Sequence, residues 1–433
     1  MQKFLSKLDK AIFALLVAWC FFAFFLKVPP ATNLFAPLLF VGLILYICFD
    51  FKTAKETFLT NLKSNFIPLL VFALLFIWAI AISLNYYVDI NPRDFKQLTR
   101  HALFFILLLT LLSWFGKKNL DNQKLIKFCF YAIVISFSIN LIYFFVQDII
   151  AIESMYKRRQ PTSSVIDRSF SKISELYFAF VFIAFLIEKE KYKKILIAIS
   201  LVIGIIYLIL SGSRGGFVAF GATFVFIIIC FILKNGINKK MLFYAFSFVA
   251  ITILSLGITV NQNKNLQERY KTTHSSGRDL IIKERFPLLL DSKYALTGLG
   301  VGETRYQKFL NDQPSQIQNK LGPKCQNITN KDLYETKFCH DEPALLGIYW
   351  HYGILGSLGF LFIVCYLIFG STKAFFKENN YYLFGLGCSV FSYFFITGLV
   401  ENHTNLKILV SCYTLYIIFK SAKFNTKFSP NLS

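Results

Sequence analysis

Charged residues are scarce in this sequence, and acidic ones are the scarcer kind. Only 16% of the 433 residues are charged, with 24 Asp and Glu against 46 Lys and Arg. Soluble domains carry about 25% charged residues, so this deficit argues against a water-soluble enzyme. The chain is also 55% hydrophobic, and runs of about 20 apolar residues, the length that crosses a bilayer, recur along it. The composition predicts a polytopic membrane protein.

Several catalytic signatures are missing as well. No Walker loop follows a strand, and neither a His-Glu-x-x-His pair nor a Gly-x-Ser-x-Gly elbow occurs. No Asp-x-Asp pair is present that would hold a metal on a nucleotide sugar. ATP hydrolysis and serine hydrolysis therefore have no support, and we expect no metal site.

The formal net charge of +22 would raise the question of nucleic-acid binding in a soluble chain. In a chain this apolar, cytoplasmic loops and anionic lipid head groups account for basic excess more simply. Membrane lipids, and no nucleic acid, are the expected partners.

Twelve apolar runs remain when the sequence is divided at charge clusters and turn residues. They predict an all-α transmembrane bundle of about twelve spans, with residues 1–260 forming nine spans, 261–343 a large outer loop and 344–433 three spans. An even number of spans puts both termini on one side. The predicted spans are Ala11 to Leu26, Leu34 to Phe49, Phe66 to Leu84, His101 to Phe115, Leu125 to Val146, Phe170 to Ile187, Ile195 to Leu210, Phe217 to Leu233, Met241 to Val260, Ala344 to Phe369, Tyr381 to Val400 and Lys407 to Phe419.

Lys and Arg are distributed differently over this topology. Lys occurs in every inner segment, as the positive-inside rule expects, whereas all ten Arg fall in outer segments. Guanidinium forms a bidentate fork that matches phosphate oxygens, and ammonium is a point charge. The outer face is therefore predicted to hold an anion; chance and ordinary salt bridges remain the alternative.

The hydrophilic stretch from Asn261 to Pro343 is too long for an ordinary connection, which indicates a functional loop. The segment that begins at Ser276-Gly277-Arg278-Asp279 predicts a capped amphipathic helix on the membrane surface. A glycine-rich turn at 298–302 and a short helix near Thr304 to Leu310 follow.

Two cysteines, Cys325 and Cys339, lie in this loop, while the other seven lie in predicted spans. If the loop faces an oxidising periplasm, a disulfide between the two is the natural hypothesis. Zinc is the competing interpretation, but two Cys and one His fall short of the usual paired-ligand spacing.

The segment Ser211-Gly212-Ser213-Arg214-Gly215-Gly216 lies between two apolar runs. An Arg at the edge of the bilayer is costly unless it faces a polar cavity or an anion. Gly215 and Gly216 would let backbone N–H groups approach that anion at the start of the next helix. A simple outer turn with a snorkelling Arg is the structural alternative.

His340 stands beside two carboxylates, Asp341 and Glu342, just before a predicted span. Near a bilayer surface its ring would provide a base close to neutral pH. The alternative is a polar helix start in which one of the carboxylates acts as the cap.

These features occur together in an order that resembles a known family. They are the Ser-x-Ser-Arg-Gly turn at 211–215, the Gly-Arg-x-Leu helix start at Gly277, and the His340 segment leading into a span with Gly353-Ile-Leu-Gly356. With these motifs in this order, the chain resembles the O-antigen ligase and polymerase superfamily. Within that superfamily it most resembles the O-antigen ligases of bacterial lipopolysaccharide assembly. Asp341 departs from the family pattern, in which an amide-like residue is common here, and the step from His340 to Gly353 is longer than usual.

The resemblance implies a multi-pass inner-membrane glycosyltransferase with a GT-C-like fold, cytoplasmic termini and a periplasmic loop. It would transfer a glycan from undecaprenyl pyrophosphate to a lipid A-core sugar, with no metal, ATP or other cofactor. By matching positions, Arg214 and Arg278 would contact the pyrophosphate and His340 would be catalytic. Auxiliary contacts to the substrate are then expected from Arg158, Arg159, Arg285, Gly215 and Gly216, and direct attack by the acceptor would invert the anomeric carbon.

Three alternatives remain open. An O-antigen polymerase uses the same donor, but no Arg here has Gly eleven positions later, the pattern associated with polymerases. A periplasmic protein O-oligosaccharyltransferase shares the superfamily outline. A lipid-linked glycan flippase or other transporter would place charges near the membrane midplane, where this chain has few.

Overall fold

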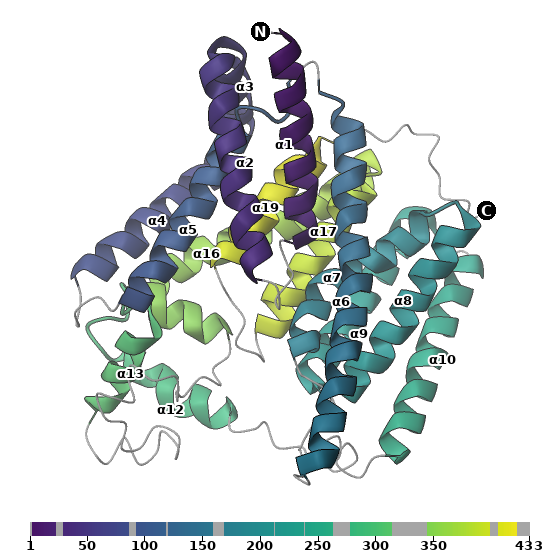
Figure 1. The fold of residues 1–433 in the computed structure, drawn as a ribbon. Coiled ribbons are helices and arrows are strands. Elements are labelled where there is room, and N and C mark those ends of the chain that lie inside the picture. The colour runs from purple at the N-terminus through teal and green to yellow at the C-terminus, as the bar shows by residue number, and fades with distance from the viewer. Residues whose placement is uncertain are drawn as a thin grey trace.

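The computed structural model describes residues 2–22, 29–85, 92–117, 120–158, 169–211, 213–237, 239–262, 278–313, 344–398 and 406–421. Within these ranges the chain is helical and contains no strand. Figure 1 shows long helices side by side, with α12 and α13 at the end opposite the N-terminus. The helices are α1 (Gln2–Phe22), α2 (Pro29–Phe49), α3 (Phe51–Ser64), α4 (Phe66–Asn85), α5 (Pro92–Leu111), α6 (Asn122–Arg158), α7 (Ser169–Ile187), α8 (Lys191–Leu210), α9 (Arg214–Asn235), α10 (Lys239–Gln262), α12 (Arg278–Leu290), α13 (Glu303–Asn311), α16 (Ala344–Glu378), α17 (Tyr381–Val390), the π-helix η2 (Phe391–Thr397) and α19 (Leu406–Lys420).

A helix lies on each of the twelve apolar runs, which confirms the predicted all-α fold for the described ranges. Among the described residues, five helices, α4, α6, α8, α9 and α16, are long and apolar enough to cross a membrane. The pair of α2 and α3, bent by 115°, raises that number to six if it counts as one span. The helices support a multi-pass membrane protein, while the number twelve, the topology and the three-part division stay predictions.

The helices α17 and α19 lie in the interior of the bundle. Every residue of α17 except Tyr382 is buried, and α19 is buried from Leu409 to Phe419. Neighbouring helices explain this burial, because α17 packs on α16 and α7 while α19 packs on α5 and α17. A helix enclosed in this way needs no polar face. Aromatic rings fill much of the space, as where Phe375 and Phe384 stack with centroids 4.0 Å apart.

A second, smaller apolar cluster joins α12 and α13 to the first part of α16. The Trp350 ring lies 4.3 Å from the Tyr306 ring and 5.5 Å from the Phe309 ring, measured between centroids. Leu289 of α12 is completely buried in the same cluster. These contacts hold the two helices of the long loop against the bundle.

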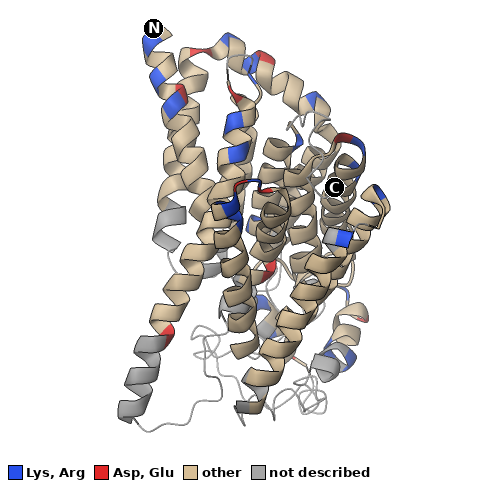
Figure 2. Cartoon of the chain, turned by 90° about the vertical axis from the view of Figure 1, so that its right-hand side faces the viewer, with Lys and Arg blue, Asp and Glu red and all other residues tan. Residues whose placement is uncertain are grey.

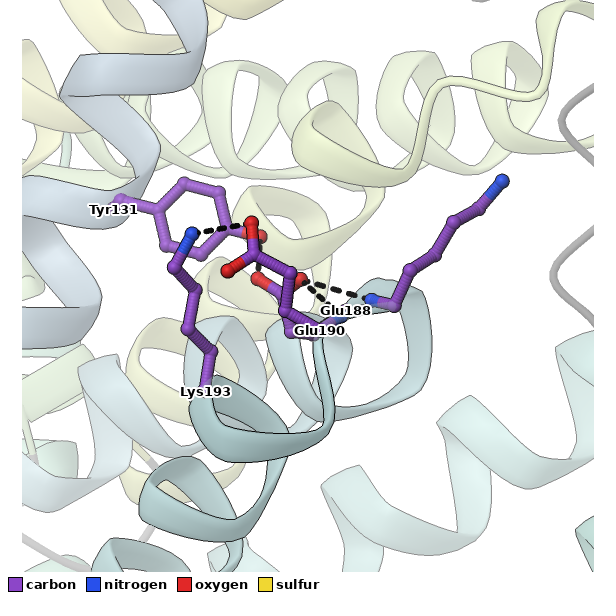
Figure 3. Close-up of polar contacts among 5 residues, drawn as sticks. Tyr131, Glu188, Glu190 and Lys193 are labelled. Atoms are coloured by element: carbon purple, nitrogen blue, oxygen red, sulfur yellow. Dashed lines mark hydrogen bonds and ion pairs between the residues drawn. The ribbon is translucent and has the colours of Figure 1, made fainter.

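The corner between α7 and α8 is fixed by one carboxylate (Figure 3). The Tyr131 hydroxyl donates to Glu188 Oε2 at 2.7 Å, and the N–H groups of Lys189 and Glu190 donate to Oε1 at 2.9 and 3.0 Å. Partial burial raises the pKa of Glu188, but these hydrogen bonds outweigh it and hold the pKa below 4.5. Lys193 pairs with Glu190 at 2.6 Å on the same corner.

Basic side chains concentrate toward one end of the bundle. In Figure 2 most Lys and Arg of the described ranges lie in the half of the molecule that holds the N-terminus, and a smaller group lies at the far end. The assignment of this end to the inner side of the membrane stays a prediction.

Candidate functional site

Ser211 and Ser213 to Gly216 of the predicted Ser-Gly-Ser-Arg-Gly-Gly segment lie where α8 ends and α9 begins, while Gly212 lies outside the described residues. Ser211 is buried and its hydroxyl donates to the Leu208 carbonyl at 2.7 Å, which closes the last turn of α8. Ser213 is the N-cap of α9, because its Oγ accepts from the Gly216 N–H at 3.2 Å. An N-cap of this kind contributes about 1 kcal/mol. The two serines therefore fix the backbone on either side of the turn.

Gly216 is closely packed in this turn. A Cβ at Gly216 would lie 3.1 Å from both Glu175 Oε1 and Leu208 Cδ1. Gly215 and Gly216 are both buried. Within the described ranges the Gly215 N–H has no hydrogen-bond partner, so it remains a donor at the helix start.

Arg214 is the first residue of α9 and is half-buried. The N-terminal end of a helix carries partial positive charge from its N–H dipoles, and the guanidinium adds a full charge at the same place. Serine caps hold the backbone, so the position of the Arg214 Cα is well defined. This arrangement suits a phosphate-type anion.

Glu175 of α7 was missed in the sequence, although it interrupts an apolar run. Its side chain is 2% exposed, and it packs against the start of α9 at Gly216. The Tyr393 hydroxyl of η2 interacts electrostatically with this carboxylate. Buried carboxylates are expensive unless they are paired, which makes Glu175 a candidate member of the site.

The π-helix η2 is the other feature that the sequence did not predict. It packs against α9 and α7, and the Thr397 hydroxyl donates to the Ser392 carbonyl five residues earlier at 2.9 Å. π-Helical turns occur frequently at functional sites. Here η2 packs against the two helices, α7 and α9, that carry Glu175 and Gly216.

The second predicted anion contact, Arg278, is the first residue of α12. The predicted helix is therefore confirmed, while the position of its side chain and its placement on a membrane surface stay predictions. Arg285, about two turns further on, is 4% exposed, and its Nη1 lies 3.5 Å from the Tyr306 hydroxyl. The auxiliary role of Arg285 toward substrate remains a prediction.

Arg305 of α13 joins the long loop to the bundle. Its side chain is 1% exposed, and Nη1 and Nη2 donate to the carbonyls of Ile82, Ser83 and Leu299. Ile82 and Ser83 lie in the last turn of α4, where carbonyl oxygens have no partner within the helix. The guanidinium thus caps α4 and holds the loop at the same time.

The helix α16 is interrupted at Gly353, whose φ of 64° and ψ of −169° leave the helical region. The loop residues before α13 replace the lost helical bonds. The N–H groups of Leu299 and Gly300 donate to the carbonyls of Trp350 and His351 at 2.8 and 3.0 Å, and the Ile354 N–H donates to Ala295 at 3.0 Å.

Glycine is required on both sides of this contact. A Cβ on Gly353 would lie 2.3 Å from the Leu296 carbonyl oxygen, and one on Gly298 would lie 2.4 Å from the Gly353 nitrogen. Trp78 of α4 donates to the Tyr352 carbonyl at 3.0 Å. The loop and the broken helix therefore form one hydrogen-bonded unit.

The remaining predicted residues lie partly or wholly outside the described ranges. Arg158 is the last residue of α6, which has 37 residues and therefore a length of about 56 Å, more than the hydrocarbon core of a bilayer. His340, Arg159, Cys325 and Cys339 lie outside the described residues. The seven described cysteines are free. Within the described part, no group of three or more His, Cys, Asp or Glu side chains is placed to hold a metal ion.

The comparisons with known proteins bear on the same part of the chain. A search of curated protein sequences found no match. A family model described as O-antigen ligase matches residues 199–330. That segment contains the α8–α9 turn with Arg214, the start of α12 with Arg278, and the Arg305 contact. The match bears out, over residues 199–330, the resemblance to the O-antigen ligase superfamily that the motifs indicated.

Proposed function

We propose that this protein is an O-antigen ligase of the bacterial inner membrane. It transfers O-antigen glycan from undecaprenyl pyrophosphate to a sugar of lipid A-core, without ATP or a metal. The family match at residues 199–330, with Arg214 at the capped start of α9 inside it, carries this proposal. The family implies a membrane glycosyltransferase-like enzyme; the donor, the acceptor and the ligase reaction are our inference.

The reaction needs two functions from the protein. The departing pyrophosphate gains negative charge as the glycosidic bond breaks, so fixed positive groups must be aimed at it. In our proposal Arg214 and Arg278 supply that charge, and the N–H of Gly215 adds a donor at the same helix start. Serine capping of α9 supports this role, because a preorganised donor loses little energy to reorganisation during the reaction.

The acceptor hydroxyl must lose its proton as it attacks the anomeric carbon. His340 is proposed as the base that takes this proton. Direct displacement by the hydroxyl would invert the configuration at that carbon. The buried Glu175 carboxylate, beside the start of α9, is proposed to hold the turn in place electrostatically.

The test is a reconstitution with purified components. Full-length protein is incubated with undecaprenyl-pyrophosphate-linked glycan and lipid A-core in the presence of chelator and without nucleotide. We expect glycan-capped core lipid and release of undecaprenyl pyrophosphate. The anomeric configuration of the product, read by NMR, tests inversion.

Each alternative gives a different product in the same assay. Longer lipid-linked glycan formed without core lipid would identify a polymerase, and glycan on an added protein acceptor would identify a protein glycosyltransferase. Movement of donor across a proteoliposome membrane with no covalent product would identify a transporter. Any of these in place of capped core lipid overturns the ligase proposal.

A further inference from the structure

An open groove lies between α2, α3 and α5, away from the α8–α9 turn. It has a volume of about 290 Å³ and is almost entirely apolar. That volume is near the lower end of the roughly 300–1,000 Å³ found for small-molecule sites. The lining residues are Ile47, Phe51, Ala54, Lys55, Phe58, Ile106, Leu109, Thr110 and Ser113.

The walls of this groove are held by a specific contact rather than by loose packing. Asn61 of α3 donates from Nδ2 to the carbonyls of Leu112 and Phe115 at 2.7 and 2.8 Å. These carbonyls belong to the turn that follows α5, where carbonyl oxygens have no partner within the helix. The C-terminal half of α3 is thus tied to α5, while its N-terminal half stands apart and leaves the groove open.

The two hydroxyls that line the groove have no proton left for a polar ligand. The Thr110 hydroxyl donates to the Leu107 carbonyl at 2.9 Å, and the Ser113 hydroxyl donates to the Thr110 carbonyl. The rest of the lining is almost entirely apolar. A hydrocarbon chain suits such a surface, since it needs no hydrogen bonds.

Lys55 is the one charged residue among the described residues that line the groove, and it is exposed. Within the described ranges it forms no hydrogen bond or ion pair. The neighbouring Lys52 is exposed on the same helix, while Phe51 is 64% exposed at the groove. An amphipathic helix with Lys above apolar side chains is typical of a membrane interface.

We propose that this groove binds one acyl chain of an anionic phospholipid, with Lys55 contacting the phosphate. A lone ammonium is a point charge that matches a phosphodiester monoanion. A pyrophosphate carrier would favour guanidinium forks, and no Arg lines the groove. The inference is independent of the proposed glycan transfer, because it concerns residues outside that site.

The experiment measures lipid binding to delipidated full-length protein by native mass spectrometry. Phosphatidylglycerol is titrated against phosphatidylethanolamine, and undecaprenyl phosphate is added in a separate series. We expect one tightly bound phosphatidylglycerol per chain. Ile106→Trp, which fills the groove from an exposed wall position, should abolish it. Lys55→Gln should weaken it roughly fivefold, the effect of about one surface cation.

Two matched variants separate the groove from the surrounding surface. Leu103→Trp adds the same bulk to α5 at an exposed position outside the groove, and Lys52→Gln removes a neighbouring charge. Both should bind as the wild type does, and all four variants should keep the wild-type melting temperature.

Unchanged binding by Ile106→Trp, or equal binding of the two phospholipids, overturns the proposal. A different contrary result would be that undecaprenyl phosphate binds more tightly than phosphatidylglycerol and loses that binding in Ile106→Trp. That result would assign the groove to a polyprenyl lipid and overturn the proposal as well. A dimer that Ile106→Trp dissolves would assign the groove to a second copy of the chain.

Discussion

Two Arg- and Gly-containing turns at the end opposite the N-terminus use the same residue types in different ways. In the α8–α9 turn, glycines bring α9 close to Glu175, and Arg214 stays half-buried at the helix start. In the loop before α13, Gly298 and its neighbours meet the break in α16, while Arg305 is buried against carbonyl oxygens. The Arg305 guanidinium thus holds the fold through backbone carbonyls, whereas for Arg214 we propose contact with the anionic donor. The two turns show that similar residue types can serve different purposes, depending on where the fold places them.

The largest effect is expected where the loop meets the broken helix. Gly353→Ala puts a Cβ into a φ/ψ region that is essentially restricted to glycine, and 2.3 Å from the Leu296 oxygen. We expect a loss of at least about 3 kcal/mol in the free energy of unfolding. Thermal unfolding in detergent measures it.

Gly347→Ala is the matched control on the same helix. A Cβ there meets nothing within 4 Å, so the substitution should be neutral or stabilise the helix by up to about 1 kcal/mol. Equal melting temperatures for the two variants would show that the break at Gly353 is not required for folding.

Replacing Arg305 should affect the stability of the protein more directly than its activity. Arg305→Met keeps the apolar stem but leaves the carbonyls of Ile82, Ser83 and Leu299 without their charged donor. Hydrogen bonds to charged groups contribute about 1.5–3 kcal/mol each, so we expect a loss of roughly 3 kcal/mol. A wild-type melting temperature would mean that Arg305 is a functional rather than a structural residue.

The sequence predicted the helices well, because long apolar runs are a strong signal and each of them proved helical. It also indicated the turn at 211–216 and the helix starting at Arg278. The 115° bend into α3 was missed, since α3 is too polar to look like a span and is held by the distant Asn61 contact. The π-helix η2 was missed because its pattern of apolar residues is the same as that of an α-helix.

The candidate site, like the fold, was predictable from the sequence only in part. Arg214 was identified from its glycine neighbours, but Arg305 carried a similar local signal and its structural role depends on α4, some 220 residues earlier. Glu175 lies within an apolar run, and its neighbours in the sequence give no sign of a site. The burial of Glu175 and Arg305 depends on contacts between segments far apart in the chain.

Arg214→Ala should show the opposite behaviour to Arg305→Met. Loss of one contact that stabilises transition-state charge costs about 10²-fold or more in rate, so transfer should fall by that factor while the melting temperature stays unchanged. Arg214→Lys should also be impaired if the bidentate fork matters. Arg100→Ala, at an exposed position on α5, serves as the control with normal transfer. Full transfer by Arg214→Ala would remove the distinction between the two turns.

Gly216→Ala tests how closely the α8–α9 turn is packed. The added methyl group meets Glu175 and Leu208 at 3.1 Å, so it should displace the start of α9 by a few tenths of an ångström. Small displacements at a catalytic site are costly, and we expect transfer to fall several-fold with a stability loss near 1 kcal/mol. Gly221→Ala on the same helix, where a Cβ meets nothing within 4 Å, should leave both unchanged. Similar transfer rates for the two variants would contradict a tightly defined turn.

The smallest effect is expected at the Lys-rich end, at the corner of Figure 3. Tyr131→Phe removes the 2.7 Å hydrogen bond to Glu188 and should cost about 1 kcal/mol at pH 7. The pKa of Glu188 is lowered in the folded protein, so its ionised form contributes stability above pH 4.5, and this contribution is lost as the pH falls through the folded pKa. The difference in melting temperature between Tyr131→Phe and the wild type should therefore shrink below about pH 4.5. Glycan transfer at pH 7 should stay normal, because this corner is a helix length away from Arg214. A difference that persists undiminished in acid would show that Tyr131 acts through packing and not through the Glu188 carboxylate.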